Sequence, residues 1–382
     1  MAAPSAYLDY NATAPVRPEV IEAVRRRQEL GGNPSSVHAS GRDARRAVED
    51  ARERVAALVN ARPDQVVFTS GGTESNNLAL AGLGARRLAV SAVEHGSVLA
   101  PALIADPDAV ILPVDGSGRV EPASIAAAAA GCGDELLVSV MLANNETGVL
   151  NPVRDIADAV HAMGAKLHCD AIQAAGKIAV DIADLGVDLM SLSAHKIGGP
   201  QGVGALVVGD GAELAARLVG GGQERGLRAG TENVPGIVGF GVAAEIAAGS
   251  LAAFAELAAW RDDLELRLAR AEPGIVVAGA PAPRLPNTSC FTMPGVAAET
   301  QVMALDLAGI AVSAGAACSS GKVARSHVLE AMGLDDEVAG SAIRVSFGWA
   351  TERGELDLLL EAWSELHART HNLRWAGAPS AA

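Results

Sequence analysis

One lysine in this sequence has surroundings that suit chemistry better than a solvated surface charge. Lys196 follows a short apolar run, residues 187–192, which predicts a buried strand. His195 precedes it, and the glycines of residues 198–204 indicate a tight backbone that approaches a ligand closely. A lysine in this position can form a Schiff base, the bond by which enzymes hold pyridoxal 5′-phosphate (PLP). The alternative is a lysine that only caps a helix.

Other polar side chains also follow apolar runs. Asp170 ends the strand expected at residues 166–170, and a buried carboxylate there needs a cationic partner such as a protonated pyridine nitrogen. His95 comes just after the strand expected at residues 88–92, where a histidine can stack on a planar cofactor or move a proton. Asn145 follows a further strand. The alternatives are a helix-capping aspartate and a structural histidine.

Residues 65–78 have the order of elements that is typical of an anion-binding site: a strand, a glycine turn, a hydroxyl and the start of a helix. The apolar run 65–70 is followed by Gly72 and Thr73, and a helix is expected from Leu78. This order points backbone N–H groups and a helix dipole at an anion, usually a phosphate. It is not a P-loop, because no Gly-Lys-Ser/Thr follows. Simple capping of the helix by Thr73 is the alternative.

Two further residues are candidates for substrate chemistry. Cys318 lies among small residues that predict a flexible, open segment, and the nearby Lys322, Arg325 and His327 favour its thiolate. Arg344 lies within a short predicted strand, where it suits bidentate capture of a carboxylate. The alternatives are a buried, inert cysteine and an arginine that forms an interdomain ion pair.

Composition narrows the classes of function. The chain has 382 residues, of which 49% are hydrophobic, so we expect a large domain and a second, smaller one. A formal net charge of -15 argues against a dedicated binder of nucleic acid or of anionic membranes. Aromatic residues make up only 3%, which leaves little for base stacking.

Neither a metal site nor a secreted protein is indicated. Four cysteines are scattered without CxxC spacing, so no metal site or disulfide framework is predicted: Cys132, Cys169, Cys290 and Cys318. Residues 1–6 lack the pattern of a secretory signal. Residues 236–260 are rich in Ala, Gly and Val, but Glu245 and Glu256 interrupt them, which favours a buried or interface helix over a membrane span. We therefore expect a cytoplasmic protein.

Strands and helices alternate along most of the chain, which predicts an α/β fold. We expect a large domain at residues 13–250, with a central, mostly parallel sheet flanked by helices. Residues 1–12 and 251–382 should form a smaller α+β domain that carries Cys318. The polar clusters all follow strands, where open α/β sheets place their sites, so they should share one pocket.

At this point the motifs resemble those of the cysteine desulfurases in order and spacing. The match runs from about Leu8 to about Asp357. The motifs are Thr69-Ser-Gly-Gly-Thr-Glu-Ser-Asn-Asn77, Glu94-His-Gly-Ser97, Asn144-Asn-Glu-Thr-Gly148, Cys169-Asp-Ala-Ile-Gln173, Ser193-Ala-His-Lys196, Gly220-Gly-Gly-Gln-Glu-Arg-Gly-Leu-Arg-Ala-Gly-Thr231, Ala316-Ala-Cys-Ser-Ser320 and Ile343-Arg-Val-Ser-Phe-Gly348. The resemblance implies the class V aminotransferase-like fold, PLP fold type I, as a homodimer with PLP near the subunit interface.

The resemblance also implies how PLP is held. Lys196 would form the Schiff base, and Asp170 would pair with the pyridine N–H. His95 would stack on the ring and assist proton transfer, and Gln173 would hydrogen-bond the ring hydroxyl. The residues implied for the phosphate are Gly72, Thr73, Ser193, His195 and, from the partner subunit, Thr231.

For the substrate, the resemblance implies Asn145 and Arg344 at the carboxylate, with Asn33 near it. Cys318 would be the nucleophile that takes sulfur from L-cysteine as a persulfide and leaves L-alanine. The segment around Cys318 is similar to the longer, sulfur-delivering type, which favours a protein acceptor such as an iron–sulfur scaffold. A cysteine on an open segment can approach the substrate and then leave to hand over sulfur.

Other functions remain open from the sequence. A selenocysteine lyase or an aminotransferase of the same fold would depend less on Cys318. A catalytically silent sulfur-transfer subunit is a second alternative, against which the candidate lysine, aspartate, histidine, cysteine and arginine are all present. A nucleotide-binding Rossmann protein is a third, weakened because no G-x-G-x-x-G follows the first strand.

Overall fold

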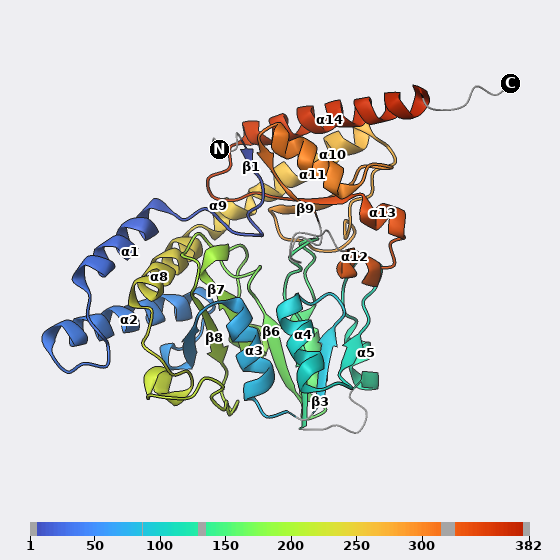
Figure 1. The fold of residues 1–382 in the computed structure, drawn as a ribbon. Coiled ribbons are helices and arrows are strands. Elements are labelled where there is room, and N and C mark those ends of the chain that lie inside the picture. The colour runs from blue at the N-terminus through green and yellow to red at the C-terminus, as the bar shows by residue number, and fades with distance from the viewer. Residues whose placement is uncertain (1–5, 86, 129–134, 315–324, 377–382) are drawn as a thin grey trace.

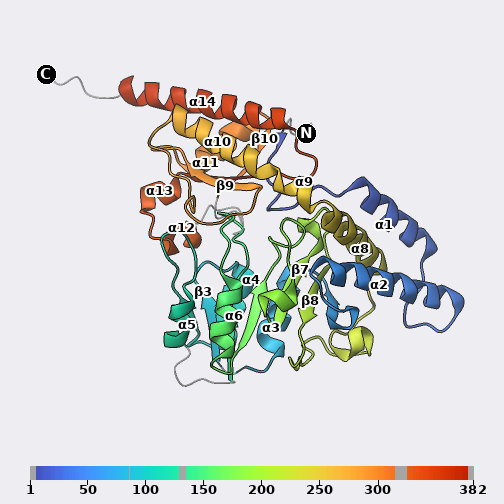
Figure 2. The same ribbon diagram turned by 180° about the vertical axis from the view of Figure 1, so that it is seen from behind.

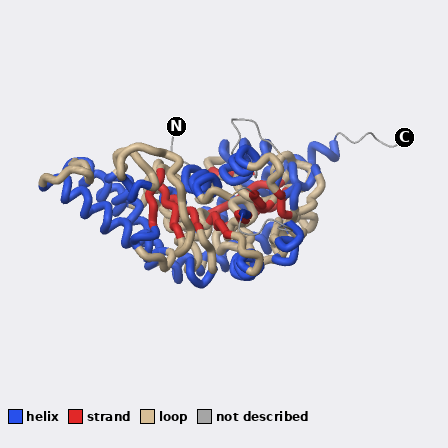
Figure 3. Tube along the Cα trace, turned by 90° about the horizontal axis from the view of Figure 1, so that it is seen from below, coloured by secondary structure: helices blue, strands red, loops and turns tan. Residues whose placement is uncertain are grey.

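The computed structural model describes residues 6–85, 87–128, 135–314 and 325–376, with side chains through residue 370. Its largest element is a sheet between two layers of helices (Figures 1, 2 and 3). Across this sheet the strands lie in the order β2 (Val66–Thr69), β8 (Gly204–Val208), β7 (Leu189–Ser193), β6 (Lys166–Asp170), β5 (Leu136–Ser139), β3 (Arg87–Ser91) and β4 (Val110–Leu112). Strands β7 to β4 run parallel, whereas β8 is antiparallel to both of its neighbours. The expected mostly parallel sheet is confirmed.

Helices cover both faces of this sheet, so its inner strands read as continuous apolar runs. Helices α3 (Gly72–Gly82) and α4 (Gly96–Ala105) lie on the face toward the viewer in Figure 1. The other face, seen in Figure 2, carries α2 (Ala39–Leu58), α6 (Val153–His161) and α8 (Val234–Gly249). The shorter or peripheral helices of this part are α1 (Pro18–Leu30), α5 (Pro122–Ala128) and α7 (Ile182–Leu185).

A smaller sheet lies beyond the carboxyl ends of the parallel strands (Figure 1). It has the antiparallel order β11 (Ser313–Ala314), β12 (Ala342–Ser346) and β9 (Thr288–Thr292). Strand β1 (Ala6–Tyr7) pairs in parallel with β10 (Ile310–Ala311). The helices of this part are α9 (Leu251–Ala255), α10 (Leu257–Ala271), α11 (Ala298–Leu307), α12 (His327–Ala331), α13 (Asp336–Gly340) and α14 (Arg353–Ala376).

Hydrophobic side chains gather in separate cores for the two parts. The core of the large sheet draws its members from Val20 to Leu285, mostly from helices α2, α6 and α8 and the strands. A second core joins Ala6 and Leu8 to side chains of the smaller part as far as Leu366. Apart from Leu285, these two cores follow the division into residues 13–250 and residues 1–12 with 251–382, which we retain as a proposal, and a third cluster joins Val93 and Met141 to Cys290 and Val328 across it.

Two local expectations differ from the structure. Helix α3 begins at Gly72 instead of Leu78, with Gly71 as its N-cap, so Thr73 lies inside the first turn and does not cap it. The apolar stretch 236–260 is not one helix: it breaks at Ser250 and again at Glu256. Both differences follow from local chemistry, since glycine tolerates the helix-entry backbone and serine favours helix ends over interiors.

No single helix in the described part of the chain is long and apolar enough to cross a membrane. One bent pair, Val234–Gly249 with Leu251–Ala271, passes the same length and composition test, with a bend of 66° between its halves.

Candidate active site

A cavity of about 290 Å³ lies where the carboxyl ends of β6 and β7 face the smaller sheet. Most of the predicted site residues line it: Gly72, Thr73, His95, Asn145, Asp170, Gln173, Ser193, His195, Lys196 and Arg344. The expectation of one shared pocket is therefore confirmed for these residues. Asn33 and Thr231 do not line the cavity within this chain. Cys318 and Lys322 lie outside the described residues.

Lys196 reaches the cavity from a single turn of 3₁₀ helix, Ala194–Lys196, that follows β7 directly. Its side-chain amine donates hydrogen bonds to the backbone oxygens of Asn11 at 2.6 Å and Ala12 at 2.8 Å. The chain can turn back behind it because Gly199 has no side chain: a Cβ there would lie 2.8 Å from the backbone oxygen of Ala194. The glycines after the lysine are thus required by backbone packing.

Asp170 ends β6 at the bottom of the cavity. Its carboxylate accepts hydrogen bonds from the side-chain amide of Asn76 at 2.8 Å and from the backbone N–H of Ile172 at 3.0 Å. Burial is the largest influence on this carboxyl and raises its pKa above the ordinary value. A cationic group placed in the cavity would therefore be strongly favoured beside it, because it would offset the cost of burying the charge.

The opposite end of the cavity can receive an anion. Gly72 opens helix α3 there, and a Cβ on Gly72 would lie 2.2 Å from the terminal methyl of Ile172, so a larger residue would require that side chain to move. The hydroxyl of Ser193 is buried and has no hydrogen-bond partner among the described residues. His195 contacts the hydroxyl of Thr13 at 3.2 Å, and burial lowers the pKa of His195 to about 4, which leaves a neutral ring. These are the donors that a phosphate requires.

His95 stands at the start of helix α4 as its N-cap. Its Nδ1 accepts the backbone N–H of Ser97 at 3.1 Å and lies 2.8 Å from the Ser97 hydroxyl. Burial lowers the pKa of His95, Asp170 opposes this shift, and Lys196 and His327 add to it. The ring is neutral at neutral pH, and because Nδ1 accepts, its proton lies on Nε2, from which it can be donated.

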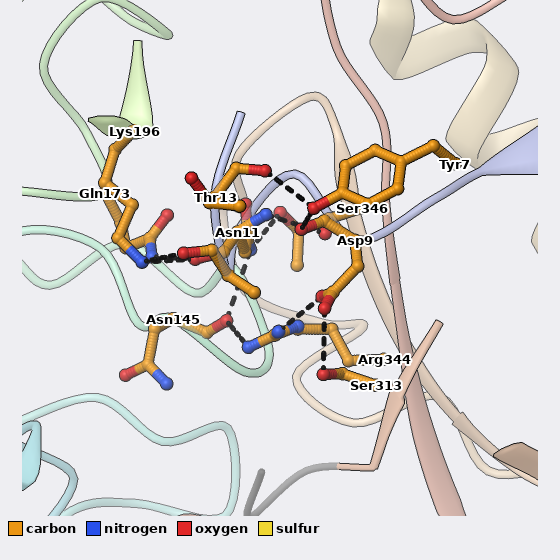
Figure 4. A network of polar contacts seen from close by, with 12 residues as sticks. Tyr7, Asp9, Asn11, Thr13, Asn145, Gln173, Lys196, Ser313, Arg344 and Ser346 are labelled. Atoms are coloured by element: carbon orange, nitrogen blue, oxygen red, sulfur yellow. Dashed lines mark hydrogen bonds and ion pairs between the residues drawn. The ribbon is translucent and has the colours of Figure 1, made fainter. Parts of the chain in front are cut away.

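Arg344 forms the wall of the cavity that belongs to the smaller sheet (Figure 4). Its guanidinium donates to the carboxylate of Asp9 at 2.7 Å and to the backbone oxygen of Asn145 at 3.0 Å. The other carboxylate oxygen of Asp9 accepts from Ser313 at 3.2 Å. Arg344 faces the cavity as expected, but its ion pair with Asp9 lies within the expected smaller domain, so no interdomain ion pair is found for it among the described residues; its contact with the larger part is the hydrogen bond to Asn145. A guanidinium has five N–H donors, so two bonds leave donors for a substrate carboxylate.

The residues around the predicted nucleophile are described only from Arg325 onward. Arg325 pairs with Asp336 at 2.7 Å, and His327 contacts the backbone oxygen of Glu94 at 2.8 Å. Both basic side chains thus have partners other than the expected thiolate.

Sequence reasoning missed three polar residues of this site. Asp9 and Asn11 belong to a segment that was expected only to be extended, and they reach the site because β1 pairs with β10 and Asp9 bridges to Ser346 of β12. Lys177 lies behind Gln173, with its side chain 3% exposed. No local sequence pattern singles out this lysine, because its burial depends on side-chain oxygens of Asn11 and Gln173 that tertiary packing brings to it.

Comparison with known proteins identifies the family to which this chain belongs. The family model for aminotransferase class V matches residues 6–359. Cysteine desulfurase IscS of Dictyoglomus turgidum is 40% identical over 366 residues, which are 93% of this chain and 92% of that protein. The solved NifS-like protein of Rickettsia africae superposes with a TM-score of 0.88 at 33% identity, over 95% of this chain and 99% of its own. SspA, solved in complex with cysteine, gives a TM-score of 0.77 at 30% identity, over 90% and 99%.

The chain belongs to the class-V aminotransferases, among the cysteine desulfurases. Cysteine desulfurases of this fold are PLP-dependent enzymes, and PLP fold type I is confirmed. The cavity fits the group. The buried Asp170 suits a pyridinium, the unpartnered Ser193 hydroxyl and the Gly72 helix start suit a phosphate, and Lys196 supplies the amine.

Proposed function

We propose that this cysteine desulfurase removes sulfur from L-cysteine in the described cavity and leaves L-alanine. One observation carries the proposal: Lys196, Asp170 and Arg344 line the same cavity although they come from two sheets. This places an amine, a buried carboxylate and a carboxylate-binding guanidinium around one small molecule. The complex of the related SspA with cysteine supports the choice of substrate.

Residues of the large sheet would hold the cofactor. Lys196 would bind it covalently, Asp170 would pair with the ring nitrogen, and Gln173 would donate to the ring oxygen. The phosphate would lie against Gly72, Thr73, Ser193 and His195. PLP, when bound, supplies an electron sink that stabilises negative charge on the substrate's α-carbon.

The remaining residues would handle the substrate. Arg344 and Asn145 would orient its carboxylate, and the neutral ring of His95 would move a proton. The thiolate of Cys318 would attack the sulfur of bound cysteine, so that the C–S bond breaks, its electron pair stays with carbon, and carbon takes up a proton. Sulfur would remain on Cys318 as a persulfide.

We extend the proposal to partners on the basis of family resemblance. The enzyme would act as a homodimer, in which Thr231 of each chain reaches the other chain's phosphate site and Asn33 lies near the substrate. This assignment accounts for a Thr231 that is remote from its own cavity. A sulfur-accepting protein such as an iron–sulfur scaffold would take the persulfide sulfur in the cytoplasm, where free thiols such as those of Cys169 and Cys290 persist.

The test is an absorbance spectrum of the purified protein before and after L-cysteine, with alanine and sulfide assayed in the same samples. We expect a visible PLP band that changes with cysteine while alanine and sulfide form together. Cys318→Ser should keep the band and still respond to cysteine, yet make no sulfide. Sulfide release from that variant would overturn the persulfide step, and a band without sulfide from the unsubstituted protein would overturn the reaction.

A further inference from the structure

Lys177 is a buried amine that the proposed reaction does not use. It lies in the turn after β6, and its side chain is only 3% exposed. Its amine donates to two side-chain oxygens, Oδ1 of Asn11 and Oε1 of Gln173, each at 2.7 Å. Both acceptors belong to residues that line the cavity, whereas Lys177 does not line it. The lysine therefore stands one layer behind the site.

These two hydrogen bonds decide which way both amides face. An amide side chain has one oxygen that accepts and one NH₂ group that donates. Because the amine of Lys177 donates to Oε1 of Gln173, that oxygen is directed toward Lys177, and the Gln173 NH₂ donates to the backbone oxygen of Asn11 at 2.9 Å. Without Lys177, the bond from the Gln173 NH₂ to the backbone oxygen of Asn11 would remain, among the described residues, to oppose a turn of the Gln173 oxygen toward the cavity.

The same logic applies to Asn11. With its oxygen held by Lys177, its NH₂ donates to the Thr288 hydroxyl at 2.9 Å and to the backbone oxygen of Asn145 at 3.2 Å. Asn11 also offers its backbone oxygen to the amine of Lys196 at 2.6 Å. One buried amine thus contacts the side chains of both Asn11 and Gln173.

Burial lowers the pKa of Lys177 well below its ordinary value, and the positive charges of Lys196 and Arg344 lower it further. The two oxygen acceptors oppose this shift, because both accept hydrogen bonds from the amine.

We propose that Lys177 is a positioning residue that locks the amides of Gln173 and Asn11, so that Gln173 presents its NH₂ to the ring oxygen of bound PLP. The proposal rests on the function proposed above and adds a residue that does not touch the cofactor. If Lys177 merely filled space, an isosteric apolar side chain would replace it without consequence for the cofactor.

The experiment compares Lys177→Met, which keeps length without N–H donors, with Gln173→Met in the cofactor-loaded enzyme. The readout is the pH midpoint at which the visible absorbance band changes. An N–H donated to the ring oxygen draws electron density from it and weakens its hold on the neighbouring proton. Loss of that donor should therefore raise the midpoint by about one pH unit in each variant. The double variant should show no further rise, because both changes remove the same interaction.

Three outcomes would overturn the proposal: a Lys177→Met midpoint equal to that of the unsubstituted protein, single shifts that add in the double variant, or a Gln173→Met variant with no shift. Absence of a visible band from the unsubstituted protein would instead overturn the proposed function and this inference with it.

A second variant covers the case in which Lys177→Met does not fold, as judged by its thermal denaturation. Lys177→Gln keeps an NH₂ donor on a shorter side chain, so its midpoint should lie between those of the unsubstituted protein and Gln173→Met. A folded Lys177→Gln variant with the midpoint of the unsubstituted protein and unchanged cofactor affinity would contradict the positioning role.

Discussion

Two walls of the cavity differ in how the chain builds them. The sheet wall consists of Asp170, Gln173, Ser193, His195 and Lys196, which follow two adjacent parallel strands and span 27 positions of the sequence. The crossing wall consists of Asn11 and Arg344, together with Asp9, which makes an ion pair with Arg344 across 335 positions. The sheet wall is therefore fixed by strand order, whereas the crossing wall exists only once the N-terminal segment has packed against strand β12.

The largest effect is expected in the sheet wall. Asp170→Asn keeps the shape of the side chain but cannot carry the charge that would balance a cationic ring. We expect kcat to fall by about 10³-fold, the scale on which a directed electrostatic interaction acts in a low-dielectric site. Steady-state kinetics with L-cysteine measure it, and Asp64→Asn, an exposed surface change, is the matched control. Turnover close to that of the unsubstituted enzyme would remove Asp170 from the cofactor site.

The crossing wall should respond to Arg344→Lys mainly through KM. Lysine keeps the charge but loses the planar fork that binds a carboxylate with two parallel hydrogen bonds. We expect KM for L-cysteine to rise about 10- to 100-fold with a smaller change in kcat. Arg353→Lys, at an exposed ion pair, is the control. A fall in kcat alone would argue that Arg344 acts on the reacting atoms instead of the carboxylate.

The sheet wall was largely predictable from the sequence. Its residues come directly after apolar runs, and the carboxyl ends of parallel strands meet at one edge, so their convergence follows from local patterns. The start of α3 was misplaced because the glycine pair reads as a turn, although Gly72 is in fact the first helical residue.

The crossing wall could not be predicted in the same way. Arg344 was found as a single residue of suitable type, but its partner Asp9 lies in a segment without periodicity, and only tertiary packing brings the two together. Lys177 was missed for another reason. A lysine is usually exposed, and its burial here depends on two amide oxygens contributed by residues 166 and 4 positions away.

The free energy of unfolding should depend on pH through His168, a histidine buried behind the sheet wall. His168 is buried in β6 between the hydroxyls of Ser139 at 2.8 Å and Ser191 at 2.9 Å, and burial lowers its pKa to about 3 from an ordinary 6.5. The unfolded chain therefore binds a proton that the folded protein does not. The resulting stability is complete above pH 6.5 and is lost as the pH falls toward 3, by about 1.4 kcal/mol per pH unit.

His168→Gln should remove this contribution. Chemical denaturation at several pH values between 7 and 4 should show a free energy of unfolding that falls less steeply by about 1.4 kcal/mol per pH unit. Measurements of both proteins at pH 8, where histidines are neutral folded or unfolded, provide the reference. Parallel pH dependences in the two proteins would show that His168 gains a proton in the native state.

The smallest effect is expected at Asp9, on the crossing wall. Asp9→Asn weakens the ion pair that orients the Arg344 guanidinium, so KM for L-cysteine should rise by about 3- to 10-fold with kcat nearly constant. Steady-state kinetics of Asp9→Asn, Arg344→Lys and the double variant measure how the two residues are coupled. The effects of the two substitutions on KM should not add, because the residues are in contact. A lower KM would instead show that Asp9 competes with the substrate carboxylate.

The pairing of the first described strand has a consequence for biosynthesis. The backbone of Leu8 bonds Ala311 at 2.9 Å and Ser346 at 2.8 Å, so a segment that leaves the ribosome early waits for partners made about 300 residues later. At roughly 5–20 residues per second, that delay is roughly 15–60 s. During this interval the large sheet can assemble, but Asn11 cannot yet be held beside Lys196. The nascent chain should therefore complete the substrate-binding side of the cavity, which needs Arg344, only after synthesis has passed β12.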